Sequence, residues 1–233
     1  TASNNSAFGN GALYLNTTGN DNTGLGYYAL GANTTGEDNT AVGNNCLDAN
    51  TTGVRNTAVG MNTLSANTTA NNNTALGQGS MFLNTTGTEN TAVGKSSLDA
   101  NTSGDQNVAI GKDALGANTT ASNNTAVGYK SLEGNLTGHS NVAIGSFALD
   151  NANTNHNTAI GHEAMTNATA SECVAVGSRA LKAHTSGARN SALGSEAATA
   201  VTTADDITAI GRSCLAACTT GDSNTALGSK SLM

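Results

Sequence analysis

The chain has 233 residues and a mass of 23.0 kDa, and among its residues are 33 Asn, 35 Thr and 28 Gly, with no Trp and no Pro. Only 11% of the residues are charged, against about 25% in a typical globular domain, and much of the 37% hydrophobic content is alanine. These values argue against an ordinary globular core, and the low charge argues against disorder. The lack of proline suits a backbone whose N–H groups are needed in a hydrogen-bonded ladder.

Net charge and hydropathy exclude two classes of partner. The net charge of −7 and the pI of about 4.8 argue against nucleic acid, which requires a basic face. No apolar run reaches the roughly 18 residues that a membrane span needs, so we expect no membrane insertion. The chain begins at Thr1 without a charged segment before an apolar stretch and ends within a repeat at Met233, so we expect a fragment or a processed product.

A seventeen-residue repeat, T-A-V-G-x-x-x-L-x-x-N-T-T-G-x-x-N, runs through the whole chain. Its fourth position is glycine in all fourteen copies, its third is always a large apolar residue, and its second is alanine in thirteen. We therefore predict one repeat domain over residues 1–233. Its units start at Ser6, Thr23, Thr40, Thr57, Thr74, Thr91, Val108, Thr125, Val142, Thr158, Val174, Ser191, Thr208 and Thr225.

The residue types of the unit predict strands and turns. Asn, Thr, Val and Gly are poor helix formers, which disfavours helical hairpins. We expect a short strand at T-A-V-G, a second extended piece around the eighth-position leucine, and a turn at N-T-T-G where Gly or Asn takes positive φ. Parallel stacking at about 4.8 Å per coil would give a rod roughly 65 Å long. The predicted fold class is all-β, a parallel β-solenoid of about fourteen coils.

Asparagine recurs at two fixed positions of the unit. It closes the unit before twelve of the fourteen strands, as at Asn22, Asn39 and Asn56. It also occupies the eleventh position in many units, as at Asn50 and Asn67. In a parallel stack, amides at equivalent positions can hydrogen-bond to one another along the axis. We therefore predict two asparagine ladders, which give the N-x-T/S sequons at these positions a structural role.

The predicted strand is apolar on both faces, which normally means that both faces are buried. Alanine and glycine would fit a narrow interior beside the leucine, leaving the third-position row outside as an association surface. We expect a closed homotrimer around this row. The alternative places this row inside a single chain and alanine outside. The trimer-axis candidates are Val42, Val59, Leu76, Val93, Ile110, Val127, Ile144 and Ile160.

The strand motif resembles those of known fibrous proteins. Asn39 to Gly43 reads N-T-A-V-G, and Asn107 to Gly111 and Asn141 to Gly145 both read N-V-A-I-G. With the following x-x-x-L and N-T-T-G, these segments resemble the repeats of bacteriophage tail-fibre and tailspike proteins. They are similar, too, to the head repeat of trimeric autotransporter adhesins of the YadA type.

The resemblance implies a homotrimeric, extracellular β-roll, on a virion tail fibre or a bacterial cell surface. Such a β-roll acts as a shaft or a receptor-binding surface, with a cell-surface glycan or protein as its receptor. The unit here is longer than the adhesin head unit, and the chain carries no C-terminal trimerising or chaperone domain.

Candidate chemistry is sparse. The four histidines do not all share one unit position and are not expected to converge, and no nucleophilic triad or carboxylate pair recurs. We therefore expect no enzymatic activity, no metal and no cofactor. The four cysteines do not form a disulfide framework, and we expect buried free thiols. Acidic residues at positions 15 and 16 form a predicted solvated edge, with bridging calcium as the alternative. They include Asp38, Glu89, Asp105, Asp205 and Asp206.

Two ligand hypotheses remain. Tyr14, Tyr27 and Tyr28 bring aromatic rings together in the first two units, where they could stack on a sugar or simply pack at the end of the stack. The expected function is attachment to a host cell surface as part of a fibre or adhesin. The alternatives are an ice-binding solenoid that presents threonine ladders and a purely structural filament.

Overall fold

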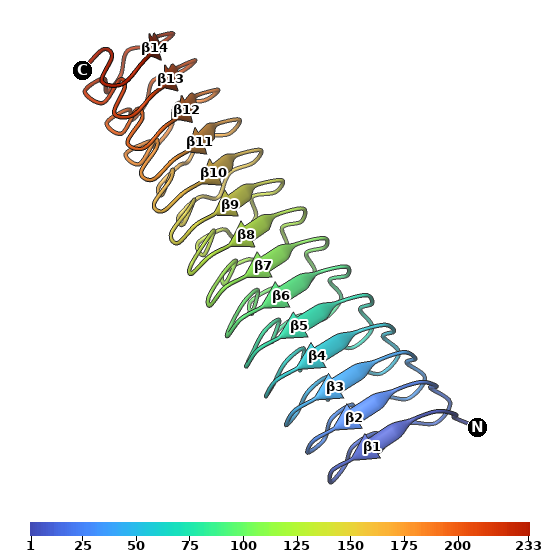
Figure 1. Cartoon of the computed structure of the whole chain (residues 1–233). Helices are drawn as coiled ribbons and strands as arrows, with labels where there is room; N and C mark the ends of the chain where they lie inside the picture. The colour runs from blue at the N-terminus through green and yellow to red at the C-terminus, as the bar shows by residue number, and fades with distance from the viewer. The chain divides into compact units, whose positions relative to one another are not determined.

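A computed structural model describes all residues, 1–233, and the chain divides into two compact units, Thr1–Ser122 and Asn123–Met233. Each unit is a stack of coils with one three-residue strand per coil (Figure 1). The first unit holds β1 (Ser6–Phe8), β2 (Thr23–Leu25), β3 (Thr40–Val42), β4 (Thr57–Val59), β5 (Thr74–Leu76), β6 (Thr91–Val93) and β7 (Val108–Ile110). The second holds β8 (Thr125–Val127), β9 (Val142–Ile144), β10 (Thr158–Ile160), β11 (Val174–Val176), β12 (Ser191–Leu193), β13 (Thr208–Ile210) and β14 (Thr225–Leu227).

Within each unit the strands pair in parallel with their neighbours, and equivalent repeat positions lie opposite each other. Thr40 pairs with Thr57, Ala41 with Ala58 and Val42 with Val59. The same register continues where a coil has sixteen residues, as between β9 and β10. This register confirms the predicted parallel β-solenoid, whose strands begin at the residues where the sequence places the repeat starts.

The interior of the coil is narrow and is filled from six repeat positions. Second-position alanines such as Ala41 and eighth-position leucines such as Leu47 are fully buried. Positions 7, 11, 14 and 17 complete the interior with small or amide side chains such as Cys46 and Asn50. The third position points outward, so the orientation with alanine inside is confirmed and the alternative with valine inside is wrong.

The path after the strand differs from the predicted second extended piece. The segment is a series of tight turns, in which the sixth and eighth residues take left-handed conformations, as at Asn45 (φ 48°) and Leu47 (φ 51°). The left-handed turn aims the leucine inward at a cost in backbone strain, and its burial offsets that cost.

Positive φ also falls elsewhere than predicted. The N-T-T-G asparagine and glycine do not adopt it, whereas the fourth-position glycine and the sixteenth residue do, as at Gly43 (φ 140°) and Asp38 (φ 58°). The fourth position has no room for a side chain either. A Cβ atom on Gly43 would lie 2.3 Å from the carbonyl oxygen of Gly60. Close approach of stacked coils therefore explains the glycine there.

Both predicted asparagine ladders are present. In the closing position, Asn39 Nδ2 donates to Asn22 Oδ1 at 3.2 Å and to the Gly53 carbonyl at 2.8 Å. In the eleventh position, Asn50 Nδ2 donates to Asn33 Oδ1 at 2.8 Å and to the same Gly53 carbonyl at 3.0 Å. In coils that carry both asparagines the two ladders thus meet at one backbone carbonyl, which fixes the turn between them.

Candidate functional site

The outward face of the strands in the first unit carries two parallel rows of side chains. The first position supplies mainly threonine, and the third supplies an apolar residue two places on, which a strand directs to the same side. Leu76 and Ile110 are 47% and 39% exposed, while Val42, Val59 and Val93 are half-buried. The row is therefore an apolar surface repeated at every coil, with no partner inside the chain.

The second unit presents the same face on its own strands. Ile144 and Ile210 are each 39% exposed, and Leu193 is 51% exposed. Val127 and Ile160 are half-buried. All eight trimer-axis candidates thus lie outside the coil in their own unit, as a docking surface requires; their role in a trimer stays a prediction.

The threonines of N-T-T-G have two different roles. The twelfth-position hydroxyls donate to the backbone of the next coil, as Thr34 Oγ1 does to the Thr51 carbonyl and Thr51 Oγ1 to the Thr68 carbonyl, both at 3.0 Å. The thirteenth-position threonines, such as Thr52 and Thr86, are exposed. Threonine is therefore presented to water mainly at the first and thirteenth positions, with exposed twelfth-position threonines at Thr17, Thr169, Thr185 and Thr219.

The tyrosine cluster of the first two coils is only partly assembled. Tyr27 and Tyr28 make an edge-to-face contact with ring centroids 4.7 Å apart. Tyr28 also packs over Gly11, whose Cβ would lie 3.1 Å from the ring. Tyr14 is 74% exposed and makes no ring contact with the other two. The structure therefore brings together a pair of rings rather than three.

The acidic edge is used within the protein. Asp105 Oδ1 accepts from the backbone N–H of Thr88 at 2.7 Å, and Asp205 Oδ1 accepts from that of Ala188 at 2.7 Å. Arg189 pairs with Asp206 at 2.7 Å and 3.0 Å. No group of three or more His, Cys, Asp or Glu side chains is arranged to hold a metal ion. These carboxylates cap the backbone of the preceding coil.

The cysteines are all free, as predicted. Cys46, Cys173 and Cys214 are buried, but Cys218 is half-buried, so the prediction of burial is wrong for that residue. Burial raises the pKa of Cys46 to about 12, and its thiol donates to the Ala58 carbonyl at 3.1 Å. The buried thiols therefore stay protonated and serve as small interior side chains.

Two of the four histidines lie together, contrary to the expectation that the histidines do not converge. The rings of His139 and His156, in adjacent coils, make an edge-to-face contact at 5.2 Å, and His162 lies 6.5 Å from Phe147. Each of the first pair is the fifteenth residue of its unit, which places the two rings on the same edge of neighbouring coils. His184 lies apart, fully buried in the interior.

His184 occupies an eleventh position, where other coils carry the ladder asparagine. Its Nε2 accepts from Asn190 Nδ2 at 3.0 Å, and its Nδ1 has no hydrogen-bond partner. Burial lowers the pKa of the imidazole, while Gly187 and Asp205 act in the opposite direction. The side chain is therefore held neutral at neutral pH.

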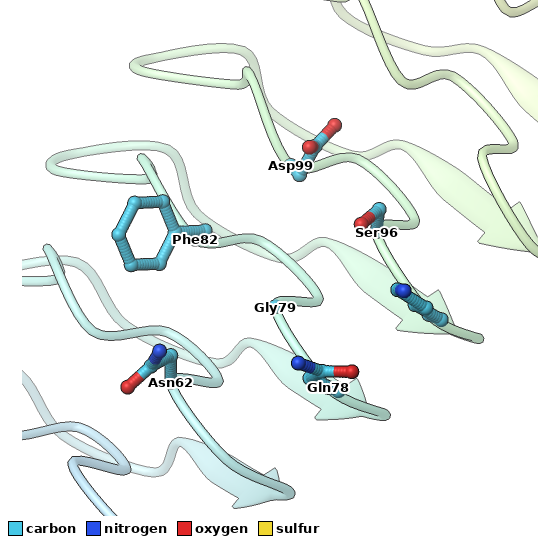
Figure 2. Close-up of a pocket in the computed structure, with 7 residues that line it drawn as sticks. Asn62, Gln78, Gly79, Phe82, Ser96 and Asp99 are labelled. Atoms are coloured by element: carbon cyan, nitrogen blue, oxygen red, sulfur yellow. The ribbon is translucent and has the colours of Figure 1, made fainter.

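A shallow recess, missed by the sequence reasoning, opens on the first unit beside the turns that follow β4, β5 and β6. Its volume is about 230 Å³, and Gly79 and Phe82 lie at its centre (Figure 2). Around them stand the side chains of Asn62, Gln78, Lys95, Ser96 and Asp99. The only sequence signal is glycine at the sixth position with an aromatic residue at the ninth, a combination that the first coil also has in Gly11 and Tyr14.

Comparisons of the chain with protein-family models, with curated proteins and with solved structures find no match. The structure contains no helix of the length and apolar character needed to cross a membrane.

Proposed function

We propose that the chain is a non-enzymatic shaft or receptor-binding segment of an extracellular fibre or surface adhesin, which attaches its bearer to a host cell surface. The observation that carries the proposal is the outward apolar row at the third repeat position, which is at least partly exposed in every coil. Continuous apolar rows of this kind mark association surfaces. We further propose that three chains pack around this row, since a closed symmetric assembly covers a surface that is identical in every copy.

The interior supports a mechanical role. Hydrogen bonds link each coil to the next through the backbone, through two amide ladders and through the twelfth-position hydroxyls. The buried side chains are alanine, leucine and asparagine, which hold the coil together. The outward rows are then free to vary and to bind without loss of the fold. Multiple equivalent surfaces on a trimer would raise the avidity for a surface receptor.

Sedimentation velocity of the purified chain tests the assembly. We expect a species near three times 23.0 kDa. The double variant Leu76→Glu/Ile110→Glu should sediment as a folded monomer, because charges on the apolar row cannot be buried at an interface. The matched control is Thr86→Glu/Thr120→Glu, which adds the same charges in the same coils on an exposed threonine row and should remain assembled. A monomeric unsubstituted chain would contradict the trimer.

Attachment itself is tested by incubating the fluorescent chain with panels of bacterial cells. We expect binding to some cells that is weakened when the assembly is dissociated by Leu76→Glu/Ile110→Glu. Binding that is equal for this variant and its Thr86→Glu/Thr120→Glu control would contradict a role for trimer avidity. Absence of binding to every cell type would contradict the attachment function.

Ice binding is the second candidate, favoured by the exposed first-position threonines. Thr57 and Thr74 are exposed and in register, next to Val59 and Leu76 on the same strand face. This surface carries no charge, so it could order water in a regular array. An ice-recrystallisation assay decides between the two: inhibition that is lost in Thr57→Lys/Thr74→Lys would favour ice binding over attachment.

A further inference from the structure

We propose that the recess around Gly79 and Phe82 is a binding site for a single pyranose sugar ring. The inference deepens the attachment function, on which it rests, by naming the class of surface ligand. The first coil carries the same residue types at the sixth and ninth positions, Gly11 and Tyr14, but there the ring of Tyr28 lies against Gly11. The space beside Gly79 stays open, so the recess is a local feature of its coil.

The recess exists because of a missing side chain. The sixth residue of each coil has a left-handed backbone conformation. In the two adjacent coils this residue is Asn62 (φ 54°) or Ser96 (φ 52°), each of which has a side chain. Gly79 (φ 64°) leaves the same place empty. A Cβ atom there would meet only the Ser96 hydroxyl, at 3.9 Å. The backbone therefore does not demand glycine at this position, and its effect is to open the surface.

One wall of the recess is an aromatic ring. Phe82 stands at the ninth position, where the neighbouring coils carry Ser65 and Asp99, and it is 41% exposed. Figure 2 shows Gly79 between the ring of Phe82 on one side and the side chains of Gln78 and Ser96 on the other, with Asn62 below and Asp99 above. An exposed aromatic ring next to an open floor offers an apolar platform, on which the C–H face of a sugar can stack.

The opposite wall is polar and is not used by the fold. The side chains of Asn62, Gln78, Lys95 and Ser96 make no hydrogen bond or ion pair within the chain. Together they offer amide donors and acceptors, a hydroxyl and an ammonium group to the hydroxyls of a ligand. Lys95 would attract a sugar carboxylate, and Asp99 in the same lining would repel it, so neutral and acidic sugars are both tested. A platform on one side and mixed donors and acceptors on the other match the two chemical faces of a pyranose.

The size of the recess limits the ligand. Its volume of about 230 Å³ is below the roughly 300–1,000 Å³ of pockets that hold drug-sized ligands. It therefore fits one sugar ring, with the rest of a glycan extending into solvent. Monosaccharide affinity at such an open site would be weak, and several copies on one assembly would multiply it.

Saturation-transfer NMR on the full chain tests the site with four probes, the methyl β-glycosides of glucose, galactose, N-acetylglucosamine and glucuronic acid. We expect transfer to at least one of them. Phe82→Ala should weaken that binding by roughly tenfold through loss of the stacking surface. Gly79→Ser should abolish it, because serine fills the recess in a conformation that Ser96 already adopts. Lys95→Ala should weaken the glucuronide selectively.

Leu83→Ala is the matched control. Leu83 follows Phe82 and is 45% exposed, yet it does not line the recess, so this variant should bind as the unsubstituted chain does. Circular dichroism checks that all variants fold. Absence of transfer to all four glycosides overturns the proposal, as does transfer that survives both Gly79→Ser and Phe82→Ala, or equal weakening by Leu83→Ala. Because the free sugars report on the recess alone, their failure would leave the sedimentation and cell-binding results standing.

Discussion

The two compact units are built from the same type of coil, but they differ in the stacked residues at the eleventh repeat position. In the first unit this column is asparagine in every coil from Asn16 to Asn118, and each amide donates to its neighbour. In the second it starts with Asn135 and continues as Ala152, Ala168, His184, Val201 and Cys218. The comparison shows that the strand, the fourth-position glycine and the buried leucine suffice for the fold, and that the amide ladder is an additional stabilising element.

The fourth-position glycine should be equally essential in both units. Gly43→Ala and Gly177→Ala would each place a Cβ atom against a carbonyl oxygen, at 2.3 Å and 2.4 Å, on a backbone with φ near 140°. We expect each to destabilise its unit by more than about 3 kcal/mol. Amide hydrogen exchange reads the two units separately. Gly79→Ala is the control, and a small effect of either main variant would contradict the close-approach argument.

The ladder itself is tested by exchanging residues between the units. Asn67→Ala removes the donor to Asn50 Oδ1 and the acceptor for Asn84 Nδ2, so we expect a loss of about 1–3 kcal/mol in the first unit. Ala168→Asn buries an amide between Ala152 and His184, where no ladder exists, and should destabilise the second unit by a similar amount. If Ala168→Asn were stabilising, the second unit would have room for a ladder.

His184 should make the second unit sensitive to acid. Burial lowers the pKa of the folded imidazole below its ordinary value of 6.5, so the unfolded chain takes up the proton first as the pH falls. The stability is therefore complete above pH 6.5 and decreases below it. In His184→Asn this decrease should be absent. The free energy of unfolding of the variant's second unit, relative to that of the unsubstituted chain, should therefore rise as the pH is lowered from 7.5 to 5. Urea titrations monitored by hydrogen exchange at both pH values measure the difference.

The smallest expected effect concerns the twelfth-position hydroxyls, which both units use alike. Thr51 Oγ1 donates to Thr68 at 3.0 Å and Thr185 Oγ1 donates to Thr202 at 2.9 Å. We expect Thr51→Val and Thr185→Val each to cost about 1 kcal/mol, and the exposed control Thr52→Val to cost almost nothing. Unequal losses in the two units, measured by thermal unfolding, would show that the hydroxyl row depends on the amide ladder.

Much of the fold follows from comparing the repeats with one another. The repeat period predicts where the strands begin. The alternation of Ala41 and Val42 predicts which side chain faces the interior of the coil and which faces outward, and the recurring asparagines predict the amide ladders. The turn path could not be derived in this way. Leucine rarely adopts positive φ, and its left-handed conformation at Leu47 depends on burial that only the closed coil provides.

The candidate surfaces, too, could be predicted only where their residues recur in every unit. The apolar row was predicted because it recurs in every unit. The recess was not, since the pairing of Gly79 with Phe82 is matched only by Gly11 and Tyr14 in the first coil, and two separate copies establish no periodic feature. The contact between His139 and His156 was also missed, although each is the fifteenth residue of its unit, because histidine occupies that position in these two units only.

The spacing of seventeen residues between hydrogen-bonded partners has an evolutionary consequence. The hydrogen bonds of a coil reach only the coils directly before and after it. The repeat units are therefore interchangeable and interact only with their nearest neighbours. Recombination between two such repeats, for example at Thr40 and Thr57, would delete or duplicate one whole repeat. The strand register at the junction would be the same as before. The number of repeats can therefore change between generations by whole repeats. Selection on the length of the solenoid can then act on repeat number without requiring new sequence.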